Sequence, residues 1–547
     1  MAATDILPRA MEEIEAKYLL EDGRKPRSSL RRLSEALFRA GYLVRPQGNE
    51  AVRDVYFDTP EGAALKAGWS LRWRERPGRP RTVTAKRLGG GSSGFFERTE
   101  LEQTVSGQAA LPGNPTDAAP DAFSVALSLA LERGQVRELL DTLGIDLGRL
   151  QPTFALHNQR TRIALTNQAE YPRALVELSM DQVRVAADRP LSFTEFEFEL
   201  RQGPERMLKD LGLVLADQSR LYPARVSKFQ RGRLAIGCIG APRPLPAFSP
   251  DDTWLSLCRA HLDHNREALW LWEAHAWESL HPEGVHQLRV ACRRLRSTLA
   301  AMEAVVPPRQ VQPLIAELRW LTRQLGPLRD LDVHLEWLDG VRGRLAKSAG
   351  PALNTYAAHL HRRRRLAHAR VRAALGSDRF GQLASSLDRL AESFTAESNL
   401  DTTSIRAVSA ALIEPPLERL LRRGNRIDRN SPPDKLHRLR IDLKKLRYRL
   451  ELINCAMTEQ LAPVSERLGK LQALLGAHQD AGVAAAALRA YRRSRNPGPV
   501  EKCAFRKLIR SEQATVAKQH RKFLKVWQRF ARDADWLLAP VINPEDR

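Results

Sequence analysis

The residues best suited to chemistry are charged side chains that alternate with apolar ones in short segments near the N-terminus. Examples are Glu13-Ile-Glu-Ala-Lys17, Leu71-Arg-Trp-Arg74 and Glu195-Phe-Glu-Phe-Glu199. Because alternate side chains of a β-strand face opposite sides, each segment predicts a strand with one ionic face. Carboxylates two residues apart can hold Mg²⁺ or Mn²⁺, and basic residues on a facing wall can hold phosphate oxygens. Such a site would stabilise a phosphoryl transition state without a nucleophilic side chain.

The same alternation recurs in Thr84-Ala-Lys86, Arg98-Thr-Glu-Leu-Glu102 and Arg160-Thr-Arg162. For any one strand, the ordinary interpretation is a sheet whose ionic face lies in solvent. About eight such strands in succession favour a small closed barrel with a charged lumen. The sequence contains no GxxxxGK(S/T), HExxH or GxSxG motif, and the GGGSSG run at Gly89 to Gly94 predicts a hairpin connection.

The opening ExExK series resembles the signature of the CYTH family, the triphosphate tunnel metalloenzymes. Further marks follow in that family's order across residues 11–235: Tyr56-Phe-Asp-Thr-Pro60, Leu71-Arg-Trp-Arg74, Lys86, Arg98-Thr-Glu-Leu-Glu102, Glu177 with Asp181, Glu197 with Glu199, and Ser227-Lys228. The resemblance implies an eight-stranded antiparallel tunnel with flanking helices that binds triphosphate and a divalent metal ion.

Carried over position by position, the resemblance implies the residues of that site. The candidate metal ligands are Glu13, Glu15, Glu197 and Glu199, and the candidate catalytic residues are Glu13, Glu15 and Lys17. The candidate phosphate contacts are Lys17, Arg72, Arg74, Lys86, Arg160, Arg162 and Lys228. Three roles remain open for Glu100, Glu102, Glu177 and Asp181: holding metal, pairing with the basic residues, or positioning the attacking water.

The elements that position these residues change character near the proline-rich run Gly240 to Pro250. Before it, strands dominate, with helices expected at 28–40, at 121–143 and after Pro204, and an exposed loop from Ser106 to Pro120. After it, the apolar period becomes that of helices. We predict a tunnel domain over residues 1–235, a linker over 236–250 and an all-α domain over 251–541.

The helical half contains an internal repeat. The segment from His286 to Arg296 matches the segment from His437 to Arg447 at an offset of 437 − 286 = 151. Further on, GPLRD at Gly326 matches GAHQD at 476 − 326 = 150 residues later. Two segments that recur in the same order predict a duplicated helical bundle.

Each copy of the repeat places a basic stripe beside a leucine-rich stripe on one helix. The basic stripes are His286, Arg289, Arg293 and Arg296 in the first copy, and His437, Arg440, Lys444 and Arg447 in the second. The leucine-rich stripes, expected in the core, are Leu288, Cys292, Leu295 and Leu299, and Leu439, Leu443, Leu446 and Leu450. Acidic partners one turn away are scarce, which indicates a bound polyanion. For the two histidines, a core or helix-cap role is equally open.

These motifs, together with ELRWLTRQLGPLRDLD at Glu317 to Asp332, are similar to those of the CHAD family over about residues 251–540. The resemblance implies a helical domain that binds inorganic polyphosphate and is often joined to a CYTH domain. Because the second copy reads GAHQD, the two halves are expected to bind unequally. The run from His361 to Arg365 is either a further basic patch or a solvated helix face.

The composition agrees with a polyanionic partner, since 87 Lys and Arg against 64 Asp and Glu give a net charge of +23. The five cysteines lie far apart without CxxC spacing, so no disulfide framework or zinc site is indicated. No leader or membrane span is recognisable, so we expect a cytoplasmic protein, with association with polyphosphate granules as an option.

The sequence therefore predicts a triphosphatase dependent on Mg²⁺ or Mn²⁺, which hydrolyses inorganic triphosphate or short polyphosphate, joined to a polyphosphate-binding domain. Two alternatives stay open. One is a polyphosphate-binding protein with a catalytically silent tunnel. The other is a CYTH enzyme that acts on an organic triphosphate, namely an adenylate cyclase or a thiamine triphosphatase. A specific nucleic-acid partner is not expected, because no helix-turn-helix, RNP aromatic series or zinc finger is present.

Overall fold

The computed structural model of the 547-residue chain describes residues 11–21, 24–88, 95–105, 111, 120–167, 174–187, 190–216, 221–238, 242, 244–342, 350–396, 403–495 and 498–542. Its contacts define two compact units, Met1–Gly240 with Glu278–His281, and Ala241–Trp277 with Pro282–Arg547. The predicted connection at Gly89 to Gly94 and most of the predicted loop at Ser106 to Pro120 lie outside the described residues. No helix in these ranges is both long and apolar enough to cross a bilayer.

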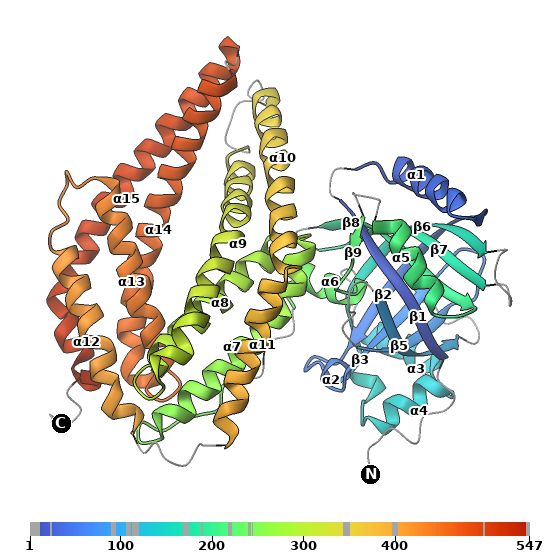
Figure 1. Cartoon of the computed structure of the whole chain (residues 1–547), viewed down its shortest axis with the longest axis horizontal. Coiled ribbons are helices and arrows are strands. Elements are labelled where there is room, and N and C mark those ends of the chain that lie inside the picture. The colour runs from blue at the N-terminus through green and yellow to red at the C-terminus, as the bar shows by residue number, and fades with distance from the viewer. Residues whose placement is uncertain are drawn as a thin grey trace. The chain divides into compact units, whose positions relative to one another are not determined.

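The N-terminal unit is built around one antiparallel sheet that closes on itself (Figure 1). Its strands follow the order β5-β4-β3-β2-β6-β7-β8-β1, and β1 then pairs with β5. Their bounds are β1 Met11–Leu20, β2 Tyr42–Asp58, β3 Trp69–Glu75, β4 Thr82–Arg87, β5 Phe95–Thr104, β6 Gln151–Asn167, β7 Ala174–Val185 and β8 Leu191–Gln202. Closure creates an interior that is lined by every second residue of each strand.

The sheet has nine strands, where the sequence predicts eight. The additional strand, β9, spans only Leu221–Pro223 and pairs with the end of β1 at Tyr18–Leu20. Nearer the start of β1, the residues Met11–Ala16 pair with β5. The closed ring is therefore formed by the eight longer strands, and β9 extends one edge of β1. A strand of three residues is too short to show the alternation by which the other strands were predicted.

The apolar faces of the strands point out of the ring and are covered by helices. One cluster packs Leu71, Trp73 and Val83 against residues of α3 (Pro120–Ala130) and α4 (Gln135–Thr142). A second packs Phe196 and Phe198 against α1 (Pro26–Arg39) and α5 (Arg206–Ala216). Since these faces are buried under helices, the alternate, charged faces must point into the ring. The short helices α2 (Ala63–Lys66) and α6 (Lys228–Ala235) and a 3₁₀ turn at Leu147–Arg149 complete the unit.

The prediction of one helix at 121–143 is wrong, because α3 and α4 are separate helices. Gly134, which directly precedes α4, has φ +118°, a conformation that side-chain-bearing residues rarely adopt. A Cβ at this glycine would also lie 2.5 Å from Oε1 of Gln103. The break therefore depends on this glycine and on its close approach to β5.

The C-terminal unit is all-α, as predicted, and its helices confirm the duplication. The bounds are α7 Trp254–Glu278, α8 Pro282–Met302, α9 Pro308–Arg342, α10 Gly350–Leu375, α11 Asp378–Ala396, α12 Ile405–Gly424, α13 Pro433–Ile453, α14 Thr458–Arg495 and α15 Pro499–Ile542. The starts of α12, α13 and α14 follow those of α7, α8 and α9 by 405 − 254 = 151, 433 − 282 = 151 and 458 − 308 = 150 residues. An isolated bridge joins Thr253 to Ser404, which are themselves 404 − 253 = 151 residues apart.

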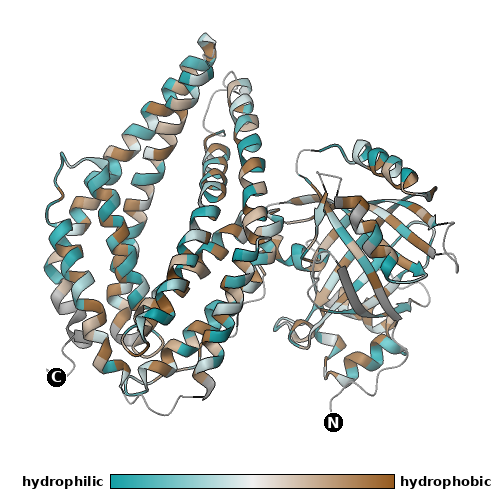
Figure 2. Cartoon of the chain, viewed as in Figure 1, coloured by the Kyte–Doolittle hydropathy of each residue, from teal (hydrophilic) through white to brown (hydrophobic). Residues whose placement is uncertain are grey.

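The helices of this unit are amphipathic, with hydrophobic and hydrophilic residues on different faces (Figure 2). Both predicted leucine-rich stripes are buried: Leu288, Cys292, Leu295 and Leu299 on α8, and Leu439, Leu443, Leu446 and Leu450 on α13. The basic stripes lie beside the leucine-rich stripes on the same two helices. The helical period therefore fixes where the basic residues lie relative to the core.

Candidate functional site

All but one of the candidate tunnel residues whose side chains are described line one cavity of about 510 Å³ in the N-terminal unit, and the exception, Asp181, contacts the lining residues Arg160 and Lys228. These residues are Glu15, Lys17, Arg72, Arg74, Lys86, Arg160, Arg162, Glu197, Glu199 and Lys228, and Glu100, Glu102 and Glu177 line the same cavity. Glu13 lies on β1 two residues before Glu15, and its side chain is outside the described part of the chain. The described candidates other than Asp181 therefore share one cavity, and their roles in metal and phosphate binding stay predictions.

Lys228, the first residue of α6, brings together the most buried charges of the lumen. Its Nζ lies 2.7 Å from Asp181, 2.8 Å from Glu195 and 2.7 Å from Glu197. Burial lowers the pKa of Lys228, but these carboxylates outweigh burial and raise it. Burial raises the pKa of Glu197, but Lys17 and Lys228 outweigh it and hold that pKa well below its usual range. Both groups therefore keep their charges near neutral pH and neither is suited to proton transfer.

Arg160 of β6 extends this network by a two-pronged contact. Its Nε and Nη2 each donate to Asp181 over 2.7 Å, and Nη2 also donates to Glu197 over 2.9 Å. Burial lowers the pKa of Arg160, but Asp181 raises it well above its ordinary value. Arg231, one turn along α6 from Lys228, binds the far oxygen of Glu195. These paired charges fix the shape of the inner lumen.

Glu15 of β1 is buried and incompletely satisfied. Lys17 and Lys86 place Nζ 2.9 Å and 3.6 Å from its Oε1. That oxygen nevertheless accepts no hydrogen bond from the described residues. A divalent cation at this oxygen would have to compete with the two ammonium groups, with which the oxygen forms ion pairs.

Three carboxylates form a row across adjacent strands next to this oxygen. Glu15 of β1 stands opposite Glu199 of β8, which stands opposite Glu177 of β7. Directly opposed like charges destabilise a sheet unless cations neutralise them. Arg201 lies 2.6 Å from Glu199, and Arg162 lies 2.9 Å from Glu177. Among the described residues, no group of three or more Asp, Glu, His or Cys is arranged to hold a metal ion.

The two predicted arginines of β3 have different surroundings. Arg74 donates to both oxygens of the buried Asp54 of β2, over 2.7 and 2.8 Å. Arg72 has only longer contacts: 3.3 Å to Thr84, 3.4 Å to Glu100 and 3.9 Å to Asp54. Burial raises the pKa of Asp54, but Arg74 and then Arg72 lower it to about 2. Arg74 therefore neutralises a buried carboxylate, whereas Arg72 is less firmly held.

The acids whose roles the sequence leaves open mostly pair with basic residues in this structure. Glu100 lies 3.3 Å from Lys86, and Glu102 accepts a hydrogen bond of 3.4 Å from Thr84. Glu177 binds Arg162 through two contacts of 3.0 and 2.9 Å. Asp181 has the Arg160 and Lys228 contacts described above. Of the three roles considered, pairing with basic residues is the one these distances favour for Glu100, Glu177 and Asp181.

In the helical unit, the two basic stripes lie close together because α8 packs against α13. Arg293 of α8 places its guanidinium 5.5 Å from the ring centre of Tyr448 on α13. Lys444 of α13 has its pKa lowered to about 8, first by burial and then by the charges of Arg440 and Arg293. Cations from both copies of the repeat therefore form one basic cluster, here called the stripe cluster.

Three arginines of the stripe cluster each have one nitrogen without an acceptor among the described residues. The Nε atoms of Arg293, Arg296 and Arg440 are buried without a hydrogen bond from the described residues. The pKa of His286 is lowered by burial and by Arg329. The other members have neutral or ionic partners: Arg289 donates to the Thr322 carbonyl over 2.7 Å, His437 lies 3.2 Å from Gln479, and Arg447 lies 2.9 Å from Glu451. Buried donors that lack acceptors suit a ligand rich in oxygen.

Sequence reasoning did not single out several residues of these networks. Asp54 occupies an inward position of β2, and Glu195 begins an acidic segment whose later members were chosen. Arg231 lies one turn along α6, a spacing that could have marked it. In the helical unit, Arg329 and Asp480 influence the stripe cluster and belong to the GPLRD and GAHQD motifs.

Two family models match the chain in tandem, the CYTH domain over residues 11–232 and the CHAD domain over residues 256–489. The chain contains a CYTH domain followed by a CHAD domain. The ordered charged strands and the repeated basic helix thus fall in the matched regions. No curated protein matches the chain.

Solved structures resemble each domain separately. The CHAD domain from the plant Ricinus communis is 24% identical, covers 53% of this chain and 96% of its own, and gives a TM-score of 0.43. PptA from Streptomyces chartreusis is also 24% identical, covering 50% of this chain and 99% of its own with a TM-score of 0.41. HpAC1 from Hippeastrum is named as a candidate adenylyl cyclase with a dominant triphosphatase activity. It is 20% identical, covers 41% of this chain and 96% of its own, and gives a TM-score of 0.30.

Proposed function

We propose that the CYTH domain hydrolyses inorganic triphosphate or short polyphosphate with Mg²⁺ or Mn²⁺, and that the CHAD domain binds longer polyphosphate. The proposed triphosphatase activity rests on the lumen of the ring, where basic and acidic side chains lie close together. Strands β3 and β8 lie halfway round the ring from each other, so Arg72 and Arg74 are placed across the cavity from Glu197 and Glu199. A triphosphate between these walls would meet cations on one side and metal-binding carboxylates on the other.

The basic residues position the phosphates. Arg72 and Lys86 can exchange their longer contacts with Glu100 for phosphate oxygens, because a guanidinium or ammonium group binds a phosphate at least as well as a carboxylate. Lys228 and Arg160 remain charged, and their carboxylate partners keep them in place. Binding at preformed cations lowers the cost of orienting the reacting groups.

Two carboxylates support the proposed cation site: Glu15 has a buried oxygen that accepts no hydrogen bond from the described residues, and Glu199 stands directly opposite Glu15. We assign these two residues, with Glu13 and Glu197, to hold Mg²⁺ or Mn²⁺, both of which prefer oxygen ligands. When bound, such an ion neutralises phosphate charge and activates water. No described side chain of the lumen needs to act as a nucleophile.

Phosphate release by the purified full-length protein tests this function. Inorganic triphosphate, ATP and thiamine triphosphate are compared at equal concentration with Mg²⁺, with Mn²⁺ and with EDTA. We expect metal-dependent release that is fastest from inorganic triphosphate. Faster turnover of ATP or thiamine triphosphate would assign an organic substrate, and no release from any of them would leave the CYTH domain as a binding module.

The stripe cluster carries the second part of the proposal. It gathers cations from α8 and α13 whose buried Nε groups lack acceptors among the described residues. A linear polyanion docking there would satisfy these donors and release its own counterions. Inorganic polyphosphate fits because it presents charged oxygens at every unit and needs no base-specific contacts.

The two β3 arginines are expected to differ on substitution. Arg72→Ala should raise the KM for triphosphate about tenfold with little change in stability, because its protein contacts are long. Arg74→Ala should lower the free energy of unfolding by about 3 kcal/mol, because it leaves the buried Asp54 without its two-pronged partner. Steady-state kinetics and urea unfolding of both variants provide the measurements. Equal effects of the two substitutions on KM and on stability would contradict the assignment of Arg72 to phosphate binding and of Arg74 to stability.

Polyphosphate binding by the CHAD domain should weaken as the pH rises above about 8. A bound polyanion favours the charged amine of Lys444, which the free protein loses around its pKa of about 8. The charge of Lys444 therefore contributes fully to the affinity below a pH of about 8. Above that pH, the affinity falls by up to about tenfold per pH unit. Titrations between pH 7 and 9.5 in EDTA check this. Lys444→Arg should remove the pH dependence, whereas Lys445→Arg, at the exposed neighbouring position, should retain it.

A further inference from the structure

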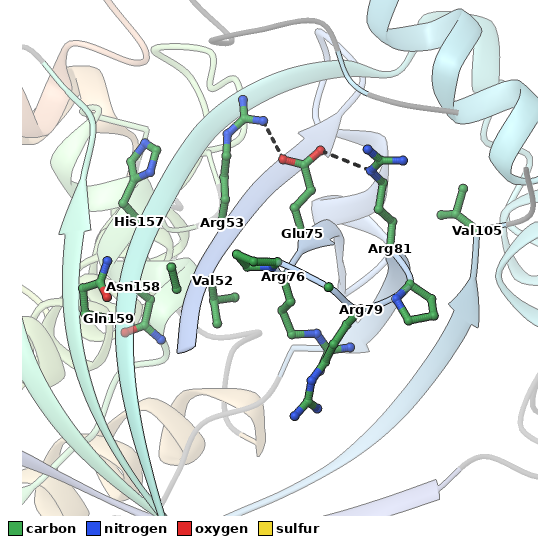
Figure 3. Close-up of a pocket in the computed structure, with 14 residues that line it drawn as sticks. Val52, Arg53, Glu75, Arg76, Arg79, Arg81, Val105, His157, Asn158 and Gln159 are labelled. Atoms are coloured by element: carbon green, nitrogen blue, oxygen red, sulfur yellow. Dashed lines mark hydrogen bonds and ion pairs between the residues drawn. The ribbon is translucent and has the colours of Figure 1, made fainter. Parts of the chain in front are cut away.

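A second cavity, of about 690 Å³, lies beside the lumen at the turn between β3 and β4. We call it the hairpin cavity, and Figure 3 shows the residues that line it. The described lining residues include the arginines Arg53, Arg76, Arg79 and Arg81, and Glu75 is the acidic residue among them. The cavity therefore has an excess of positive charge outside the predicted tunnel residues.

Glu75 forms ion pairs with two arginines of the hairpin cavity. It lies 2.8 Å from Arg53 and 3.8 Å from Arg81, and the dashed lines of Figure 3 mark both contacts. Arg81 is 40% exposed, so its guanidinium can be reached from solvent. One carboxylate carries less charge than two guanidinium groups, so the described lining residues on this side of the cavity have an excess of positive charge.

Two arginines line both the hairpin cavity and the lumen. Arg76 and Arg79 belong to the linings of both cavities, and in Figure 3 their side chains extend the opposite way from Arg53 and Arg81. The Nε of Arg76 is buried and has no hydrogen bond from the described residues. Burial and then Arg74 lower the pKa of Arg76, and the charges of Glu102 and Glu50 do not outweigh them. Cations thus continue from the lumen across the turn into the hairpin cavity.

We propose that the hairpin cavity binds the phosphates of a linear polyphosphate that extend beyond those held in the lumen. This inference rests on the proposed function and narrows the substrate class to chains longer than triphosphate. Arginines suit it because a planar guanidinium binds phosphate oxygens through two donors. The described lining residues include no Phe, Tyr or Trp, and with four arginines beside the single ring of His157 the lining is dominated by cations rather than by stacking surfaces.

The test compares two substrates in the full-length protein, inorganic triphosphate and linear chains of about 15 phosphates. The variant Arg53→Gln/Arg81→Gln removes two cations that line the hairpin cavity and do not line the lumen. We expect its KM for triphosphate to stay within twofold of wild type and its KM for the longer chains to rise about tenfold. The matched control Arg31→Gln/Arg39→Gln, at exposed positions of α1, should change neither value.

Each outcome has a distinct meaning. An equal rise of both KM values, or no change in either, would overturn the inference. If the double variant fails to fold, the single variant Arg81→Gln carries the same comparison, because the Arg81 side chain is partially exposed and its contact with Glu75 is the longer of the two.

If the wild type hydrolyses neither substrate, the proposed function fails and the inference is then tested by equilibrium binding in EDTA. The titration uses chains of about 15 phosphates and a background in which Arg289, Arg293, Arg440 and Lys444 are alanine, which removes the stripe cluster as a competing site. An affinity loss in the hairpin variant would support the cavity as a phosphate site. Unchanged affinity would overturn it.

Discussion

Replacing Glu15 by glutamine should lower metal-dependent phosphate release about 100-fold or more while the domain stays folded. The substitution preserves shape and removes the charge of a carboxylate whose buried oxygen lies beside Lys17 and Lys86 and accepts no hydrogen bond from the described residues. An amide is a weaker ligand for Mg²⁺ or Mn²⁺, and loss of one group that stabilises a charged transition state typically costs this much. The rate is measured with inorganic triphosphate at several metal concentrations, with circular dichroism as the check on folding.

Two comparisons make the result specific to the metal role. Glu35→Gln removes a carboxylate from the exposed face of α1 and should leave turnover unchanged. In Glu15→Gln, residual turnover should require a higher concentration of Mg²⁺ or Mn²⁺, because the remaining ligands bind the ion less tightly. A folded Glu15→Gln variant with wild-type turnover and an unchanged metal requirement would exclude this residue as a ligand.

The second large effect is expected in the CHAD domain. Replacing Arg289, Arg293, Arg440 and Lys444 with alanine should weaken the binding of long-chain polyphosphate at least about 100-fold. These residues come from both copies of the repeat, and Lys444 is influenced by the cations of α8 as well as by those of α13. Four fewer cations should also flatten the slope of log affinity against log salt concentration by about 3. Titrations of the full-length protein in EDTA measure both quantities.

The matched control replaces Arg309, Arg389, Arg422 and Lys518, which are exposed on four other helices, with alanine. It changes the net charge equally, so we expect a much smaller loss of affinity. Equal losses in the two sets would mean that diffuse charge, rather than the stripe cluster, drives binding. Duplex DNA provides a further comparison: displacement of polyphosphate by DNA at equal phosphate concentration would favour general polyanion binding over a polyphosphate site.

Much of the CYTH lumen could be predicted because side-chain direction in a strand is local. Once Arg72 and Arg74 alternate with Leu71 and Trp73, burial of the apolar pair under α3 and α4 decides that the arginines face inward. The same reasoning placed Glu197 and Glu199. A short strand such as β9 and a helix break set by Gly134 give no comparable periodic signal, so both were missed.

What the sequence by itself determined is which side chains share a face, since the periods of strands and helices are properties of neighbouring residues. Only the tertiary structure decided which faces meet. Glu15 and Glu177 flank Glu199 because β8 lies between β1 and β7, and Asp54 meets Arg74 because β2 pairs with β3 in one particular register. The two basic stripes likewise form one cluster because α8 packs against α13. Such meetings depend on the pairing of segments far apart in the chain, which the local pattern of one segment does not encode.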